Sequence, residues 1–397
     1  MSQLASRLDL IAPSPTLALD SKANAMRAAG KDVIGFGIGE PDFNTPEHIC
    51  EAAIKAIRDG FTRYTEVDGI FELKEAICEK FKKDNGLKYD LPQIVVSNGG
   101  KHTLYNIFMV LFQPGDEVIV PTPAWVSYVP MLTLAGATAV TVKTAAENGY
   151  AITAEQLSAA ITPRTKGLII NSPSNPTGMA YGSTLLKELS AIILKNNLWV
   201  ITDDIYEKII FDGYKFSNIL MEEPALYDRT IIAHGLAKTY AMTGWRVGYL
   251  AGPKEVARAA SKIQSQSTSN PCSISQKAAV AALTGPQDSV AEMVKSFTRR
   301  RDLALKLLLD IPGVSCPKPQ GAFYVFPDVS SYFGKRSGDK IMRNSDDIAA
   351  YLLEHGAALV PGSGFGDDNS LRLSYAVSDE DLERGLGLVK EALSTLK

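Results

Sequence analysis

The stretch Arg229–Pro253, RTIIAHGLAKTYAMTGWRVGYLAGP, places two apolar runs on either side of a loop of small residues. The loop carries a lysine, Lys238, and eight positions later an arginine, Arg246, both where a strand pattern breaks. A lysine among small and apolar neighbours is partly desolvated, which lowers its pKa and makes it usable as a nucleophilic amine or proton shuttle. An arginine within reach can hold a phosphate through two parallel hydrogen bonds. The alternative is that Lys238 is a surface lysine and Arg246 an ordinary strand arginine. Other stretches of the sequence are needed to decide between these two interpretations.

Composition limits the classes of protein and partner. The chain has 397 residues, 45% hydrophobic and 21% charged, which is ordinary for a soluble protein with one large and one smaller domain. A net charge of −3 gives no basic field for nucleic acid or acidic lipid, so small molecules or protein subunits are the expected partners. The first residues lack the pattern of a secretory signal, and no apolar run approaches the roughly 20 residues that span a bilayer. We therefore expect a cytoplasmic protein without membrane contact.

Metal and disulfide frameworks are not indicated. The four cysteines lie far apart and form no CxxC pair, and there are only four histidines to join them as zinc ligands. No metal site is therefore predicted.

The order of apolar and amphipathic segments predicts an α/β fold. From Ile94 onward, short apolar runs alternate with helical patterns, which is typical of βαβ units and a mostly parallel sheet buried under helices. Ligands of such sheets bind at the carboxyl ends of the strands. The last hundred residues, which start with a long charged helix at 288–309, suggest a second α+β domain completed by the N-terminal segment. A short helix is predicted within that segment, from Ser21 to Ala29.

A glycine turn follows the first of these strands. Gly99 and Gly100, in SNGGK at 97–101, enter a helix and present backbone N–H groups and the helix dipole to an anion. A plain tight turn is the alternative. A Walker A loop is excluded, because Val95 stands where that motif needs glycine and His102 where it needs serine or threonine.

Further chemical groups follow the later strands. Trp125 packs in the core or stacks on a flat heteroaromatic ring, and Asn175 lies in a proline-stiffened loop that either aims it at a ligand or is a plain turn. Asp203, followed by Tyr206, can cap a helix, bind magnesium or pair with a cationic ring nitrogen; without a Walker A loop the magnesium alternative weakens. Together with Lys238, these residues describe a site for a phosphorylated, flat, basic heterocycle bonded to a lysine. Pyridoxal 5′-phosphate has this chemistry.

The motifs of the chain, read in order, resemble one enzyme family. The chain is similar to class I, fold-type I pyridoxal-phosphate-dependent aminotransferases, and within them to the bacterial aspartate aminotransferase subgroup that also includes glutamate–prephenate aminotransferases. The resemblance runs over nearly the whole chain, through SPTLALDSKA, GEPDFNTPEHI, NGGK, PAWVSY, NSPSNPTG, DDIYEKIIF, AKTYAMTGWRVGY, PQGAFYVFP and LRLSYA. It implies a large domain with a mostly parallel seven-stranded sheet and a smaller α+β domain. The implied division is an N-terminal arm at 1–15, a small domain at 16–45 and 288–397, and a large cofactor-binding domain at 46–287.

The resemblance also implies roles at the cofactor. Lys238 bonds to the cofactor aldehyde and moves the proton between the substrate Cα and the cofactor, while Asp203 pairs with the ring nitrogen. The other implied cofactor contacts are Tyr206 on the phenolic oxygen, Trp125 stacked on the ring, Asn175 beside it, and Gly99, Gly100, Arg246 and Tyr64 of a neighbouring subunit at the phosphate. A crossing Tyr64 requires at least a homodimer. Gly235 stands where many relatives have a serine that donates to the phosphate, so that hydroxyl contact is missing here.

For the substrate, the resemblance implies that Arg372 grips the α-carboxylate, helped by Asn175 and the backbone at Gly39, with Trp125 beside the substrate. Lys101 is the candidate for binding a side-chain carboxylate.

The reaction expected from this resemblance is ping-pong transamination of L-aspartate with 2-oxoglutarate, giving oxaloacetate and L-glutamate. Prephenate or a broader aromatic substrate is the close alternative, which Thr65 beside Tyr64 keeps open. A β-eliminating lyase on the same fold is more distant, because Lys101 would be wasted on small neutral substrates. A ligand-sensing regulator needs a fused DNA-binding segment, for which the chain leaves no room.

Overall fold

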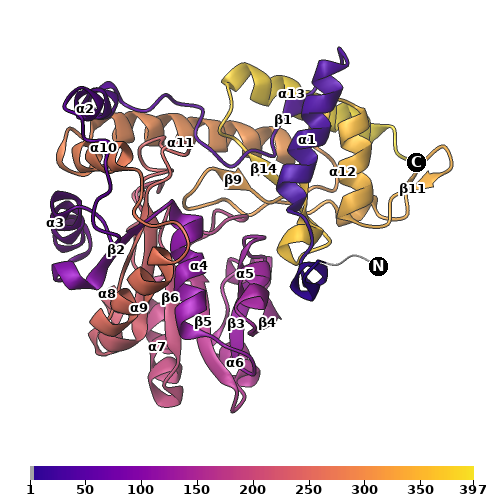
Figure 1. The fold of residues 1–397 in the computed structure, drawn as a ribbon. Helices are drawn as coiled ribbons and strands as arrows, with labels where there is room; N and C mark the ends of the chain where they lie inside the picture. The colour runs from indigo at the N-terminus through magenta and orange to yellow at the C-terminus, as the bar shows by residue number, and fades with distance from the viewer. Residues whose placement is uncertain (1–3) are drawn as a thin grey trace.

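A sheet of seven strands forms the centre of residues 4–397, the part of the chain that the computed structural model describes (Figure 1). The strand order is β2-β8-β7-β6-β5-β3-β4, and within it β8 runs antiparallel to both of its neighbours while the pairs from β7 to β4 are parallel. The predicted mostly parallel sheet is confirmed. Its strands are β2 (Ile94–Ser97), β3 (Glu117–Thr122), β4 (Thr138–Lys143), β5 (Thr165–Asn171), β6 (Trp199–Asp203), β7 (Thr230–Gly235) and β8 (Gly248–Ala251).

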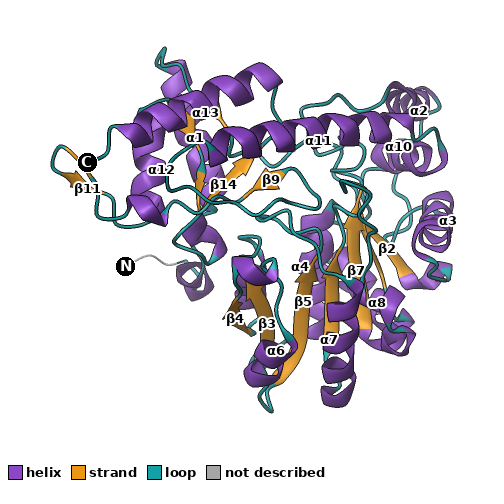
Figure 2. Ribbon diagram, turned by 180° about the vertical axis from the view of Figure 1, so that it is seen from behind, coloured by secondary structure: helices purple, strands orange, loops and turns teal. Residues whose placement is uncertain are grey.

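Helices cover both faces of this sheet, which explains why apolar residues run continuously along strands such as β7 and β8, where every residue is buried. One face packs against α4 (Gly100–Leu111), α5 (Tyr128–Leu134) and α9 (Lys254–Ser265). The other packs against α3 (Phe71–Lys80), α6 (Ala154–Ala160), α7 (Ser183–Asn196), α8 (Ile219–Glu222) and α10 (Ser273–Thr284), and α2 (Glu47–Arg58) lies on α10 (Figure 2).

A smaller α+β unit lies beyond the carboxyl ends of the strands. Figure 1 shows its indigo N-terminal helix α1 beside the yellow helices α12 and α13, although these elements are far apart in sequence. The unit contains α1 (Pro15–Ala28), α11 (Asp288–Leu309), α12 (Ser345–Glu354) and α13 (Asp379–Ser394), the antiparallel strands β9 (Tyr324–Val325), β13 (Val360–Pro361) and β14 (Leu371–Ser374), the parallel pair β1 (Ile34–Gly35) and β12 (Ala357–Ala358), and the hairpin β10 (Arg336–Ser337) and β11 (Lys340–Ile341).

The division of the chain into arm, small domain and large domain stays a prediction. Tyr206, Ile209 and Phe211, which follow β6, share one hydrophobic core with α11 to α13, so packing is continuous across the expected boundary. Residues 1–3 of the expected arm lie outside the described residues.

The helix predicted to start at Ser21 begins earlier, and this correction matters for the cavity described below. Helix α1 starts at Pro15, because proline has its φ angle set for the first helical position and lacks an N–H that the helix could not satisfy there. The helix therefore presents Thr16, Leu17 and Asp20 toward the sheet edge.

The register of the sheet gathers polar groups at one edge. Asn171 at the end of β5 pairs with Asp203 at the end of β6, which pairs with Ala233 near the end of β7. Parallel strands therefore deliver an amide, a carboxylate and the loop that carries Lys238 to the same place.

Candidate active site

A cavity of about 310 Å³ opens at this edge, between the sheet and the smaller α+β unit. Ten residues named in the sequence analysis line it: Gly39, Gly100, Lys101, Trp125, Asn175, Asp203, Tyr206, Lys238, Arg246 and Arg372. They come from positions spread over more than three hundred residues, so their convergence is a property of the fold.

Lys238 reaches into the cavity from the loop after β7. Its Nζ donates to the carbonyl oxygen of Gly39 at 2.5 Å. Burial lowers the pKa of Lys238 to about 8; Glu40 and Asp203 oppose this shift, whereas Arg246 and Arg372 reinforce it. A lysine with such a pKa is partly neutral near physiological pH, and the neutral amine is the nucleophilic and proton-accepting form.

Asp203, the last residue of β6, is a buried carboxylate in the same cavity. Burial raises the pKa of Asp203 to about 6, and the hydrogen bond that Tyr128 donates to its Oδ2 at 2.6 Å acts against that rise. Asn171 fixes the backbone here, because its Nδ2 donates to the carbonyl oxygen of Asp203 at 2.8 Å. The carboxylate is thus held rigidly and can pair with a cationic ligand atom.

Tyr206 shares a hydrogen bond of 2.8 Å with Tyr324, hydroxyl to hydroxyl. Both rings are buried, and Tyr324 also lines the cavity. Tyr324 was not among the predicted site residues, although it lies in the motif PQGAFYVFP that contributed to the resemblance.

Arg372, on β14, is a buried guanidinium in which the Nε nitrogen makes no hydrogen bond within residues 4–397. Its Nη1 donates to Oδ1 of Asn175 at 3.0 Å and its Nη2 to the carbonyl oxygen of Gly37 at 2.5 Å, while Tyr324 lies 4.7 Å from the guanidinium carbon. Its Nε is buried and has no hydrogen-bond partner within residues 4–397. Buried donors are rarely left unpaired in native proteins, so the orphaned N–H on the cavity wall indicates a place for a ligand acceptor.

The glycine turn before α4 lies directly under Arg246. Gly99 has a φ of +87°, and a Cβ atom there would come within 2.3 Å of Nη2 of Arg246, although Gly99 itself is not part of the cavity lining. Nη1 of Arg246 donates to the carbonyl oxygen of Thr243 at 2.8 Å. The guanidinium and the free N–H groups of the first turn of α4 form an anion cradle.

Gly235 also adjoins this cradle, and its lack of a side chain has a steric reason. A Cβ atom there would lie 3.1 Å from the carbonyl oxygen of Val247 and 3.3 Å from the Cα of Gly248. A hydroxyl-bearing residue at 235 would press on the neighbouring strand.

Lys101, in the first turn of α4, places its Nζ 5.1 Å from the ring centre of Trp125. Burial lowers the pKa of Lys101, and Arg246 adds to that effect. The cation–π contact keeps the ammonium group at the cavity wall, where it can bind a ligand carboxylate other than one held by Arg372.

Tyr64 is a predicted site residue that does not line the cavity of the single chain. Its side chain is 89% exposed. Its assignment to the phosphate of a neighbouring subunit remains a prediction.

Several lining residues were missed by sequence reasoning. Thr16, Leu17 and Asp20 were missed because the helix was expected to start later, and Ile38 and Glu40 because only the backbone at Gly39 was considered. A helical reading of SPTLALDSKA from Pro15 would have found the first group.

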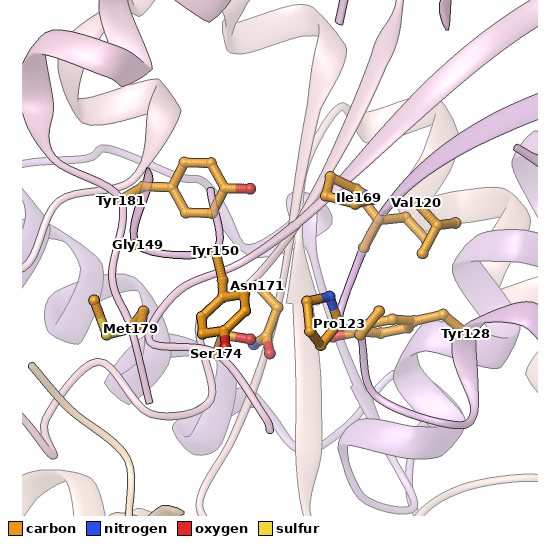
Figure 3. A pocket seen from close by; sticks show the side chains of 12 residues that line it. Val120, Pro123, Tyr128, Gly149, Tyr150, Ile169, Asn171, Ser174, Met179 and Tyr181 are labelled. Carbon is orange, nitrogen blue, oxygen red and sulfur yellow. The ribbon is translucent and has the colours of Figure 1, made fainter. Parts of the chain in front are cut away.

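A second cavity, of about 20 Å³, adjoins the first (Figure 3). Tyr128 and Asn171 line both cavities, and Figure 3 shows Tyr150 and Tyr181 facing Pro123 and Ile169 across the smaller one. This volume suits a single water molecule.

Two other kinds of feature are absent from residues 4–397. No cluster of three or more His, Cys, Asp or Glu side chains is arranged to hold a metal ion. In the same part of the chain, no helix is both long and apolar enough to cross a membrane.

Comparison with known proteins decides the family. Residues 31–388 match the family model described as aminotransferase class I and II. The chain belongs to the class I and II aminotransferases. This aminotransferase is 51% identical over 393 residues to the aspartate/prephenate aminotransferase of Cereibacter sphaeroides, covering 98% of each chain.

Solved structures agree with this aminotransferase in fold. It matches the aspartate aminotransferase of Rhizobium meliloti with a TM-score of 0.97 at 45% identity, covering 100% of both chains. It matches the aspartate aminotransferase of Thermus thermophilus with maleate with a TM-score of 0.93 at 40% identity, covering 99% of this chain and 100% of that one. The predicted fold class is therefore confirmed.

Proposed function

We propose that this aminotransferase uses pyridoxal 5′-phosphate to move the amino group of L-aspartate to 2-oxoglutarate, giving oxaloacetate and L-glutamate. One observation carries the proposal: Lys238, Asp203 and Arg372 line the same cavity, and the buried Nε of Arg372 has no hydrogen-bond partner within residues 4–397. Together they offer an amine, a carboxylate and a carboxylate-binding donor, which is the set that amino-acid chemistry on a cationic ring requires.

The residues present fit the cofactor. Arg246 above the Gly99–Gly100 turn suits a phosphate, because that cradle combines a guanidinium with helix N-terminal N–H groups. Asp203 suits the ring nitrogen, and the Tyr206 hydroxyl suits the phenolic oxygen. When bound, the cofactor supplies an electron sink for the bond broken at the substrate Cα.

The proton chemistry falls to Lys238. Its depressed pKa allows the free amine to take a proton from the substrate Cα and to deliver it to the aldehyde carbon of the cofactor, C4′. The carbonyl oxygen of Gly39 orients the amine by accepting its hydrogen bond. Asp203 stays anionic above its pKa of about 6 and so keeps a paired ring nitrogen protonated.

The substrate is proposed to be held at two ends. Nε and Nη2 of Arg372 can take the α-carboxylate as a bidentate pair, with Asn175 beside them. Lys101 can take the side-chain carboxylate of aspartate. The Thermus thermophilus structure with maleate, a dicarboxylate, supports a site for two carboxylates.

Prephenate is the second candidate substrate, because the Cereibacter sphaeroides relative is named an aspartate/prephenate aminotransferase. Prephenate also has two carboxylates, so the same two cations can receive it. The ratio of kcat/KM for prephenate to that for aspartate decides the order; a ratio of one or more would demote aspartate.

We further propose a homodimer in the cytoplasm. Tyr64 is exposed, and so are the apolar residues Ile54 and Ile57 of α2 and Phe71 of α3. Exposed apolar groups of this size commonly mark a subunit interface. The four cysteines are free, which suits a reducing compartment.

A single-turnover screen tests the reaction. The purified protein loaded with pyridoxal phosphate is mixed with single amino acids, and the absorbance of the bound cofactor is followed together with oxo-acid formation. We expect L-aspartate and L-glutamate to convert the cofactor and to yield oxaloacetate and 2-oxoglutarate. If neither amino acid reacts, the substrate assignment is wrong.

A further inference from the structure

Three charged or titratable side chains that do not line the cavity are buried together next to β6 and β7. Lys80 ends α3, Glu207 follows β6, and His234 lies in β7; their side chains are 6%, 2% and 4% exposed. Ionisable side chains are rarely buried to this extent unless they are paired. The reaction proposed above gives none of these three residues a role.

Glu207 is the centre of the cluster. Its Oε1 is paired with Nζ of Lys80, and its Oε2 accepts a hydrogen bond from Nδ2 of Asn85 at 3.0 Å. Lys80 in turn donates to Oδ1 of Asn85 at 2.9 Å. Although burial acts to raise it, Lys80 and His234 hold the pKa of Glu207 well below its usual range. Glu207 is therefore an anion with a cation at Oε1 and an amide donor at Oε2.

His234 connects this anion to β7. The N–H of Gly235 donates to Nδ1 of His234 at 2.7 Å, so in the neutral ring the hydrogen is on Nε2, which faces Oε1 of Glu207 at 3.3 Å. The ring stacks on Tyr249 at 5.2 Å between centroids with an interplanar angle of 7°. Burial lowers the pKa of His234, which keeps it neutral and preserves this single orientation.

The cluster joins the two segments that carry the reacting groups. Glu207 directly follows Tyr206 and lies four residues after Asp203, whereas Gly235 lies three residues before Lys238. A shift of Glu207 against His234 would therefore move Asp203 relative to Lys238. Displacements of about 1 Å at such distances from the chemistry can cost about a hundredfold in rate.

We propose that Glu207 and His234 are positioning residues that fix Asp203 and Lys238 relative to each other and thereby set the affinity for pyridoxal phosphate. The inference rests on the cofactor site proposed above. Neither residue touches the cavity, so both act through the segments that they hold.

The test compares the cofactor-loaded enzyme with His234→Phe and His234→Gln variants. Phenylalanine keeps the size and the stacking but loses both nitrogens, whereas the glutamine amide can still donate to Glu207. We expect His234→Phe to weaken pyridoxal phosphate binding and to lower kcat, each by at least about tenfold, with KM for aspartate changed far less. His234→Gln should recover most of both losses.

The matched control is Arg301→Gln in the smaller α+β unit. Arg301 is fully buried and ion-paired with Asp212 and Asp302, but it lies outside the cavity lining. The control should lower the melting temperature while leaving the cofactor affinity at the wild-type value.

Two results would overturn the inference. One is a His234→Phe enzyme with wild-type cofactor affinity and kcat, even if its melting temperature falls. If His234→Phe does not fold, Asn85→Ala is tested instead, because it removes one donor to Glu207 and should also weaken pyridoxal phosphate binding. The second result that would overturn the inference is an Asn85→Ala enzyme with wild-type cofactor affinity. A wild-type protein that binds no pyridoxal phosphate would refute the proposed function instead.

Discussion

The hydroxyl group of Tyr128 donates a hydrogen bond of 2.6 Å to Oδ2 of Asp203, inside the wall of the cavity. Burial alone raises the pKa of this carboxyl, and the tyrosine hydroxyl counteracts that effect by stabilising the anion. The pKa of Asp203 therefore reflects two opposing effects, burial, which raises it, and the hydrogen bond from Tyr128, which lowers it.

Replacing that donor should shift the pH dependence of the enzyme. In Tyr128→Phe the pKa of Asp203 rises above about 6, so the carboxylate is lost at a higher pH and the acid limb of the kcat/KM profile moves to higher pH. Tyr181→Phe is the control, because Tyr181 is a buried tyrosine whose hydroxyl accepts instead from the N–H of Ile152. An acid limb in the same place for both variants would contradict this role of Tyr128.

Burying the charged amine of Lys238 should lower the free energy of unfolding of the cofactor-free protein. Its pKa falls from an ordinary 10.5 to about 8, so between these values the folded state binds fewer protons than the unfolded state and stability rises with pH. Below pH 8 the folded protein carries the full free-energy cost of burying the charged amine. Lys238→Met should therefore raise the free energy of unfolding at pH 7 by about 1–3 kcal/mol, reduced from the full shift because the amine is partly exposed.

Urea unfolding of the cofactor-free proteins at pH 7 and pH 9.5 measures this effect. The gain from Lys238→Met should shrink at the higher pH, whereas Lys31→Met, at an exposed position, should show neither the gain nor its pH dependence. A less stable Lys238→Met protein would show that the buried amine is not a cost.

Gly99→Ala should weaken the binding of pyridoxal phosphate. The new methyl group would collide with the guanidinium of Arg246, which must move out of the anion cradle. Gly60→Ala is matched to it, because Gly60 has a φ of +74° but open space around it. Both variants pay a cost of about 1 kcal/mol for the left-handed backbone. We expect the loss of cofactor affinity, measured by titration, in Gly99→Ala alone.

Arg372→Lys should raise KM for amino and oxo acids while the affinity for the cofactor is unchanged. A lysine has no planar pair of donors, so it cannot replace Nε and Nη2 on a carboxylate or reach both Asn175 and Gly37. The loss of about 1.5–3 kcal/mol of charged hydrogen bonding predicts a KM about ten- to a hundredfold higher. Equal KM values by steady-state kinetics would exclude the carboxylate clamp.

Tyr64 can be tested by mixing two inactive subunits. If Tyr64 completes the site of its neighbour, Tyr64→Ala and Lys238→Ala chains that are refolded together form hybrids with one intact site each. Random pairing then restores about a quarter of the wild-type activity per dimer. Activity that stays at the level of the separate variants would place Tyr64 outside the partner site.

The central sheet could be predicted because its strands are buried on both faces. Runs such as GLIIN and LWVITD leave no room for a helical pattern, and their alternation with amphipathic segments indicates a parallel arrangement. The start of α1 could not be found in this way. Its pattern is only weakly amphipathic, with Leu17 exposed and Leu19 buried, and the helix begins at Pro15, the last residue of the expected arm.

The candidate site was predictable where a strand end and a polar residue coincide, as at Asp203 and Lys238. Contacts between distant segments were not. The pairing of Tyr128 with Asp203 and of Tyr206 with Tyr324 depends on three-dimensional packing that no local pattern encodes. The buried link from Lys80 through Glu207 to His234 was missed for the same reason.

The hydrogen bond from Arg372 to Gly37 spans 335 positions of the chain. The ribosome makes Gly37, Asp203 and Lys238 long before Arg372, so the amine and the carboxylate proposed for the cofactor are synthesised before the arginine proposed for the substrate α-carboxylate. A chain cut short before β14 would keep Asp203 and Lys238 but lose this arginine. With the roles proposed above, such a fragment would lack the α-carboxylate clamp whatever its affinity for the cofactor.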